Sequence, residues 1–198
     1  MSILQEIQAG ADLKSYTIPQ LEQLCAEIRE ELLRVVPRNG GHLSSNLGAV
    51  ELTVALHYVY NLPTDKLLFD VGHQCYAHKM LTGRQFETLR RKDGLAGFPK
   101  PSESAYDAFG AGHSGTAISA ALGYARAASI RGERYDCVAL VGDGSFMDGP
   151  GIEAFNDAGR SELPLVVVLN DNNMSISRNV GALSNYLNQL RSNKGYWR

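Results

Sequence analysis

The chain has 198 residues, of which 44% are hydrophobic, and a chain of this length can bury about 70% of its unfolded surface. Neither disulfides nor a structural metal are therefore needed to hold a fold together. With 19 basic and 21 acidic residues the net charge is −2, which offers no basic field for nucleic acid or an anionic membrane. No apolar run reaches the roughly 20 residues of a membrane-spanning helix, so we do not expect an integral membrane protein.

The N-terminus and the cysteines indicate a cytoplasmic protein. The first residues are polar and acidic, where a signal peptide would have a basic start and an apolar core. The three cysteines, Cys25, Cys75 and Cys137, include no Cys-x-x-Cys pair, so we expect reduced thiols. Cys137 lies in an apolar run and is interpreted as a core residue. Cys75 follows His73 closely, which leaves a redox or nucleophilic role open.

The first third of the chain predicts two helices. Thr17 and Gln20 form a capping box at the start of the first, whose apolar residues repeat at helical spacing until Pro37 stops the run. The second helix spans 48–60. His57 lies on its apolar stripe and is interpreted as a packed core or interface histidine.

The middle of the chain contains a short strand at 67–70 and a helix at 74–81. Residues 82–112 then lack periodicity over a length that is more typical of a functional loop than of a passive connection. An Ala-rich helix follows at 115–130. It begins directly after Gly112-His113-Ser114, where its first N–H groups are expected to be available to an anion.

The last third predicts a βαβ unit. Apolar strands at 137–141 and 165–169 flank a short helix at 151–159. This pattern is typical of an α/β fold, with helices on both faces of a parallel sheet. Parallel strands end at the same edge, so the loops 142–145 and 170–173 are expected to lie side by side where such sheets bind ligands.

These two loops carry oxygen ligands. Asp143 lies between two glycines, and 170–172 contributes Asn, Asp and Asn side chains. Hard oxygen ligands with few carboxylates favour Mg²⁺ completed by substrate phosphates and water. Each loop alone is an ordinary turn sequence. Together, each after an apolar strand, they predict a Mg²⁺-bridged diphosphate site.

The run from Gly142 to Asn172 resembles the thiamine diphosphate fingerprint, which opens with Gly-Asp-Gly and closes with paired asparagines. Further motifs narrow the resemblance to the 1-deoxy-D-xylulose-5-phosphate synthase family, which is thiamine diphosphate-dependent and transketolase-like. They are Gly41-His-Leu-Ser-Ser-Asn-Leu-Gly48, Asp70-Val-Gly-His-Gln-Cys-Tyr-Ala-His-Lys79, Gly112-His113-Ser114 and Asn170-Asp-Asn-Asn-Met-Ser-Ile-Ser177.

The resemblance assigns roles to individual residues. It implies that Mg²⁺ is bound by the side chains of Asp143 and Asn172 and by the carbonyl of Met174. It implies that His42 faces the thiazolium and the substrate and transfers protons. The cofactor would be held by His73, Gly112, His113, Ser114, Gly144, Ser145 and Asn172. The alternative for His42 and His113 is a histidine that merely caps a glycine turn.

The reaction that the resemblance implies joins pyruvate to glyceraldehyde 3-phosphate with loss of carbon dioxide, for isoprenoid precursor and thiamine biosynthesis. The cofactor carries most of this chemistry. A homodimer is expected, and neither nucleic acid nor a membrane is expected as a partner.

One loop departs from the family pattern. The family continues Gly-Asp-Gly with Ala and a Thr-Gly-Gly-Met-like stretch, whereas this chain has Ser145-Phe-Met-Asp-Gly-Pro-Gly151. Asp148 brings a negative charge that would oppose anion binding if it pointed inward. It would instead cap the helix that starts near Pro150, which we favour.

We expect residues 1–198 to be a single, incomplete N-terminal diphosphate-binding domain, with the pyrimidine-binding and C-terminal domains absent. The carboxylate that activates the aminopyrimidine in the family, and a further histidine, have no counterpart among these residues, and the tail resembles a chain cut within the family. Little turnover is therefore expected from this chain alone. The alternatives are one subunit of a split transketolase-like enzyme, whose separate chain carries the pyrimidine-binding domain, and a non-catalytic, degenerate paralogue that serves as a binding module.

Overall fold

The computed structural model describes residues 2–8 and 12–171, together with Ala182, Asn185, Tyr186, Gln189 and Ser192. A run of helices precedes the first strand, and from there on helical segments alternate with strands, as in α/β proteins. The elements are α1 (Ile3–Gln8), η1 (Leu13–Ser15), α2 (Ile18–Asn39), α3 (Leu43–Leu47), α4 (Val50–Val59), β1 (Lys66–Phe69), α5 (Tyr76–Leu81), η2 (Phe86–Thr88), α6 (Ala117–Arg131), β2 (Cys137–Gly142), α7 (Asp143–Phe146), α8 (Gly149–Ala158) and β3 (Leu165–Asn170).

The three described strands form one parallel sheet in the order β1-β2-β3. Phe69 lies opposite Leu140 in the first pair, and Gly142 lies opposite Asn170 in the second. β2 and β3 are neighbours joined through α8, so the predicted βαβ unit is confirmed. The connection from β1 to β2 passes through α5, the long loop and α6.

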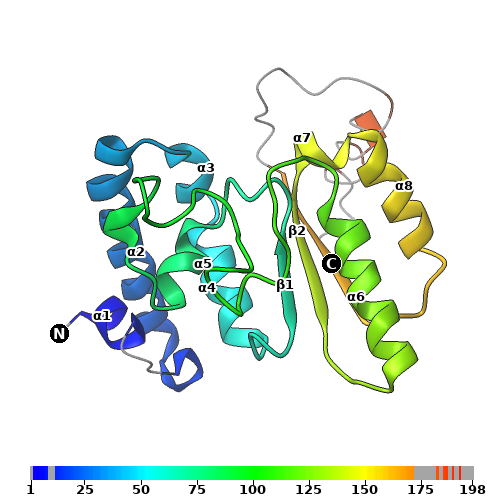
Figure 1. The fold of residues 1–198 in the computed structure, drawn as a ribbon, viewed down its shortest axis with the longest axis horizontal. Helices are drawn as coiled ribbons and strands as arrows, with labels where there is room; N and C mark the ends of the chain where they lie inside the picture. The colour runs from blue at the N-terminus through cyan, green and yellow to red at the C-terminus, as the bar shows by residue number, and fades with distance from the viewer. Residues whose placement is uncertain are drawn as a thin grey trace.

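Successive strand residues pack on opposite faces of the sheet. Leu67, Val138 and Leu140 belong to a core with α1, α2, α4 and α5, whereas Leu68 and Ala139 pack with α6, α7 and α8. Figure 1 shows the first group of helices on one side of the sheet and α6 and α8 on the other. The prediction of an α/β fold with helices on both faces is confirmed.

The first long helix begins as predicted but ends later. Thr17 is the N-cap of α2 and shares a capping box with Gln20. The helix continues through Pro37 to Asn39, so the prediction that Pro37 stops it was wrong. Pro37 lies exposed in the last turn, where one missing N–H is tolerated. The helix ends at Gly40, whose φ of +79° suits glycine and whose N–H bonds to Val36.

Two other features differ from the sequence expectation. The short helices α3 and α7 occupy segments that carry no helical periodicity. β3 is only partly covered, and the side chain of Val166 is 43% exposed, because β3 is the edge strand of the described sheet. In the part of the chain that the structure describes, no helix combines the length and the apolar character that crossing a bilayer requires.

Candidate functional site

The ends of the three strands bring the predicted loops together. Gly142 pairs with Asn170 at the last position of the β2–β3 ladder, so the loops after these strands begin side by side. β1 ends at the same edge, just before Asp70. Figure 1 shows α3 and α7 at this end of the molecule. The prediction that the strands β2 and β3 end side by side is therefore confirmed, and the use of this edge as a ligand site stays a prediction.

Asp143 lies inside the molecule, at the start of α7. Asp143 is only 5% exposed, and Ser145, two residues later in the same helix, is 8% exposed. Gly144 between them is half-buried. The segment thus forms a short helical turn that directly follows β2 and begins with a buried acidic residue.

The predicted metal ligands are described only in part. Among the described residues, no three His, Cys, Asp or Glu side chains converge as ligands for a metal ion. A cation at Asp143 would thus need oxygen atoms from other groups, which is the usual situation for Mg²⁺. Asn172 and Met174 lie outside the described residues, so their predicted roles stay predictions.

The N-terminus of α6 already has an anion, which corrects the expectation that it is open. The carboxylate of Asp70 accepts hydrogen bonds from the N–H groups of Gly115, at 2.9 Å, and Ala117, at 3.0 Å. Asp70 is 3% exposed, so its charge is satisfied by these donors in the interior. The turn that precedes Gly115 is the part that faces outward.

Gly112, His113 and Ser114 form this exposed turn. A Cβ on the neighbouring Gly115, whose φ is +76°, would lie 3.1 Å from the backbone nitrogen of Gly151. A Cβ on Gly151 would in turn lie 3.1 Å from the carbonyl oxygen of Ser145. These close approaches bring the exposed turn, the start of α8 and the Asp143 segment to one edge.

Asp148 is the N-cap residue of α8 by position, as favoured from the sequence. Its carbonyl accepts the N–H of Ile152 at 3.1 Å, and Pro150 occupies the first turn. The Asp148 side chain makes no capping hydrogen bond, however. The predicted start of the helix is thus right, but the capping hydrogen bond predicted for the Asp148 side chain is not formed, and only the Asp148 carbonyl bonds to the helix.

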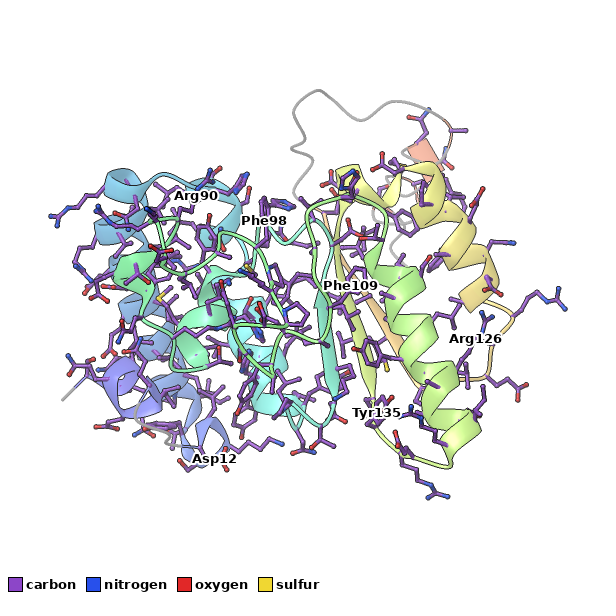
Figure 2. All side chains as sticks on the ribbon, in the orientation of Figure 1. Asp12, Arg90, Phe98, Phe109, Arg126 and Tyr135 are labelled. Atoms are coloured by element: carbon purple, nitrogen blue, oxygen red, sulfur yellow. The ribbon has the colours of Figure 1, made fainter. Side chains whose placement is uncertain are left out.

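His42 and His73 lie together although they are distant in the sequence. Their ring centroids are 5.9 Å apart with an interplanar angle of 71°, and the ring of Phe98 lies 5.9 Å from that of His42. His42 is exposed at the start of α3, and His73 is half-buried after β1. Figure 2 shows Phe98 and Arg90 at the α3 end of the molecule, with Asp12 and Tyr135 at the opposite end.

The surroundings of both histidines lower their pKa values and so favour the neutral form. Burial lowers the pKa of His42, and the charge of Arg90 lowers it further. Burial also lowers the pKa of His73, as does His42, while Asp70 acts in the opposite direction. His73 Nδ1 is buried and has no hydrogen-bond partner among the residues that the structure describes. A buried, unsatisfied ring nitrogen marks a place where a ligand would gain a hydrogen bond.

Phe98 lies near His42 in the loop 82–112, and buried polar side chains form hydrogen bonds that hold this loop in place. Asp107, which is 3% exposed, accepts two hydrogen bonds from Arg84, at 2.6 and 2.9 Å, and one from the Lys100 N–H at 2.7 Å. Glu103 accepts a hydrogen bond from the buried Lys79 at 2.9 Å. The long loop predicted as functional is therefore ordered, with only η2 as regular structure inside it.

His57 and Cys75 lie outside this chemistry. His57 Nε2 lies 2.8 Å from Nδ1 of His78, and burial, then His78, lower the pKa of His57 well below the ordinary value. The interpretation of His57 as a packed histidine is confirmed.

Cys75 is fully buried, and burial raises its pKa to about 12, so the structure gives no support to the redox or nucleophilic role that the sequence left open. Cys137 is a buried core residue, as predicted.

A cavity of about 290 Å³ lies elsewhere, between the N-terminal segment and the ends of α4 and α5. Ile7, Leu13, His57 and Tyr106 are among its lining residues. None of the residues that the sequence assigned to the cofactor or the metal lines it.

Sequence reasoning missed three residues that shape the site. Asp70 and Asn46 stand inside the quoted motifs but were given no role, and Phe98 was not singled out. For Asn46 no local signal existed, because its segment carries no helical periodicity and two of its three hydrogen-bond partners lie 27 and 30 residues further along the chain. Asp70 likewise bonds to residues that lie 45 and 47 positions further along.

Comparison with known proteins identifies the chain's relatives. The family described as 1-deoxy-D-xylulose-5-phosphate synthase matches residues 4–198. A synthase of that name from Pelotomaculum thermopropionicum is 52% identical over 99% of this chain and 31% of its own length. The 1-deoxy-D-xylulose-5-phosphate synthase 1 of Geobacter metallireducens is 56% identical over 95% of this chain and 30% of its own length. The chain thus spans about a third of the relatives that it matches.

Solved structures of transketolases share the fold. The transketolase of Campylobacter jejuni superimposes with a TM-score of 0.74 and 25% identity, over 84% of this chain and 30% of that chain. The transketolase of Leishmania mexicana gives a TM-score of 0.66 and 19% identity, over 95% of this chain and 31% of that chain. The second likeness, at its lower identity, concerns the fold alone.

Proposed function

The chain belongs to the 1-deoxy-D-xylulose-5-phosphate synthase family, and we propose that it forms the part of such an enzyme that binds the diphosphate of thiamine diphosphate through Mg²⁺. The enzyme would be a transketolase-type transferase that joins pyruvate to glyceraldehyde 3-phosphate with loss of carbon dioxide. Its product would serve isoprenoid precursor and thiamine biosynthesis.

The observation that supports this proposal most directly is the pairing of Gly142 with Asn170. It brings the buried Asp143 and the end of β3 to the same edge of the sheet. The residues that follow β3 in the sequence are rich in Asn and Asp, and oxygen ligands with few carboxylates suit a hard cation that keeps some positions for phosphate oxygens and water.

The described residues fit the cofactor as well. His73 Nδ1 lacks a partner among the described residues, and the turn formed by Gly112, His113 and Ser114 is exposed beside the Asp143 segment. We propose that these residues, with Gly144 and Ser145, hold the cofactor. Asn172 would contact both the cofactor and the metal, and Met174 would complete the metal site with its carbonyl.

When bound, thiamine diphosphate supplies a nucleophilic thiazolium carbon and an electron sink for the loss of carbon dioxide. His42 then provides a proton acceptor beside the substrate, because its lowered pKa leaves the imidazole neutral at neutral pH. Phe98 lies beside this group, with its ring tilted by 49° to the His42 ring at a centroid distance of 5.9 Å. His73 would donate or accept one hydrogen bond through its unpartnered nitrogen, according to its tautomer.

We propose that residues 1–198 act as a diphosphate-binding domain and that groups from other domains or a second subunit complete the active site. A homodimer is the expected assembly, and a separate chain with a pyrimidine-binding domain is the alternative. The cytoplasmic location expected from the sequence stays a prediction.

A calorimetric titration of the chain with thiamine diphosphate tests the proposal. We expect binding that requires Mg²⁺ and is lost with EDTA, together with little or no turnover of pyruvate and glyceraldehyde 3-phosphate. A failure to bind at millimolar cofactor and Mg²⁺ would contradict the proposal and favour the degenerate binding module. Turnover that appears only after a second chain is added would favour the split enzyme.

A further inference from the structure

Asn46 is a fully buried amide in the short helix α3, and it makes a complete set of hydrogen bonds. Its Nδ2 donates to the carbonyl oxygens of His42 and His73, each at 2.7 Å. Its Oδ1 accepts the backbone N–H of Tyr76 at 2.8 Å. A side-chain amide has two N–H donors and one oxygen acceptor, so each of these groups has a partner. The orientation of the amide is fixed, because turning it over would place its oxygen against two carbonyl oxygens.

These bonds join two segments that are distant in the sequence. His42 precedes α3, whereas His73 follows β1, and both donations come from one nitrogen atom. The third bond satisfies one of the first N–H groups of α5, which have no partner within that helix. Asn46 therefore connects the start of α3, the loop after β1 and the start of α5.

Tyr76 strengthens the same connection from the other side. Its hydroxyl oxygen accepts the N–H of His42 at 3.4 Å, and the residue is fully buried. Gly41 has a φ of +138°, and a Cβ there would lie 2.5 Å from the Tyr76 hydroxyl oxygen. The turn that carries His42 is thus closed tightly over Tyr76, and its position depends on the elements that Asn46 joins.

We propose that Asn46 is a positioning residue, which sets the separation and orientation of His42 and His73 by holding the two backbone turns that carry them. The side chains of both histidines remain free to face a ligand, since Asn46 uses only their carbonyl oxygens. The inference rests on the proposed function, because the site that Asn46 prepares is the one assigned to thiamine diphosphate. A residue with a purely structural role would change the stability of the fold without changing the surroundings of these two rings.

A measurement on the unaltered chain tests the hydrogen bonds themselves. The side-chain amide protons of Asn46 should exchange with water at least roughly tenfold more slowly than those of the exposed Asn61. Nitrogen-15 NMR resolves both amides. Exchange of the Asn46 protons as fast as that of the Asn61 protons would overturn the proposal, whatever the variants do.

Two variants test the consequence for the histidines. Asn46→Ser keeps one polar group at this position and Asn46→Ala keeps none. The matched control is Asn156→Ala, which removes an exposed amide on α8, a helix that packs on the other face of the sheet from α2, α4 and α5. We expect the pKa values of His42 and His73, followed by NMR, to rise toward the ordinary value in the Asn46 variants. The signals of His57 and His78 should stay as in the parent, as should all four in the control.

Cofactor binding gives the third readout. Asn46→Ser should weaken the binding of thiamine diphosphate with Mg²⁺ by roughly tenfold or more, because misplaced groups lose most of their interaction. A folded Asn46 variant with unchanged His42 and His73 titrations and unchanged affinity would overturn the proposal. If the parent itself does not bind the cofactor, the proposed function fails, while the exchange and titration results still decide the role of Asn46. If neither variant folds, exchange of the Asn46 protons in the parent as fast as that of the Asn61 protons still overturns the proposal.

Discussion

The carboxylate of Asp70 accepts a hydrogen bond of 3.0 Å from the backbone N–H of Ala117, which ties the end of β1 to the first turn of α6. A second bond of 2.9 Å reaches Gly115. The helix dipole at this terminus is thus met by a side chain of the protein. The N–H groups of Gly115 and Ala117 are therefore not available to a ligand at this edge of the sheet, whereas the turn before Gly115 is exposed.

Replacement of Asp70 by Ala should lower the free energy of unfolding by about 3 kcal/mol, because it leaves two buried N–H groups without their charged acceptor. Urea unfolding measures this loss. The control is Asp157→Ala, which removes a surface ion pair with Arg126 and should cost less than about 1 kcal/mol. Equal losses in the two variants would show that the Asp70 bonds do not anchor α6.

The half-buried His57 and the buried His78 predict a loss of stability in mild acid. Burial is the main cause that lowers the pKa of each ring, while the unfolded chain takes up protons near the ordinary value of about 6.5. Below that value the unfolded state therefore binds more protons than the folded state, and the free energy of unfolding falls as the pH decreases. Each such ring contributes up to about 1.4 kcal/mol per pH unit.

The variant His57→Gln isolates part of this effect. Gln keeps a donor for Nδ1 of His78 but does not titrate. Between pH 6.5 and 5 the free energy of unfolding should therefore change less steeply with pH than in the parent, by up to about 1.4 kcal/mol per pH unit, the slope that one proton contributes. Urea unfolding at several pH values gives the slope. A slope identical to that of the parent would mean that the folded protein binds a proton at His57 as readily as the unfolded chain.

The three cysteines should be unreactive in the native protein. Cys25, Cys75 and Cys137 are buried, and burial raises their pKa values to about 11, 12 and 11. A thiol that is both buried and protonated reacts slowly with disulfide reagents. We expect no rapid reaction with Ellman's reagent at pH 8 and full reaction of all three thiols in guanidinium chloride. A thiol that reacts rapidly in the native state, and is lost in Cys75→Ser, would reopen a chemical role for Cys75.

The sequence predicted the sheet well because its signals are local. The apolar runs that became β2 and β3, and the capping box of Thr17 and Gln20, depend on neighbouring residues in the chain. Pro37 misled the prediction because one missing donor is tolerated in the last, exposed turn of a helix.

The sequence predicted which strand ends lie side by side at the site, but it did not predict the contacts between residues that are distant in the chain. The parallel order of strands was enough to place the Asp143 loop beside Asn170. That Asp70 occupies the start of α6 depends on a contact across 45 residues of sequence separation, which periodicity does not report. The approach of His42 to His73 depends in the same way on the packing of α3 against the loop after β1.

The central claim is that Asp143 helps to bind Mg²⁺ and thiamine diphosphate at this edge of the sheet. The most direct measurement is the melting temperature of the parent, of Asp143→Asn and of Asp148→Asn, each with and without Mg²⁺ and the cofactor. A ligand at about 100 times its Kd adds roughly 2.7 kcal/mol to stability, which corresponds to a rise of several degrees. We predict this rise in the parent and in Asp148→Asn, which removes a charge from the same loop, and its loss in Asp143→Asn. An equal rise in all three proteins, or no rise in the parent, would contradict the account.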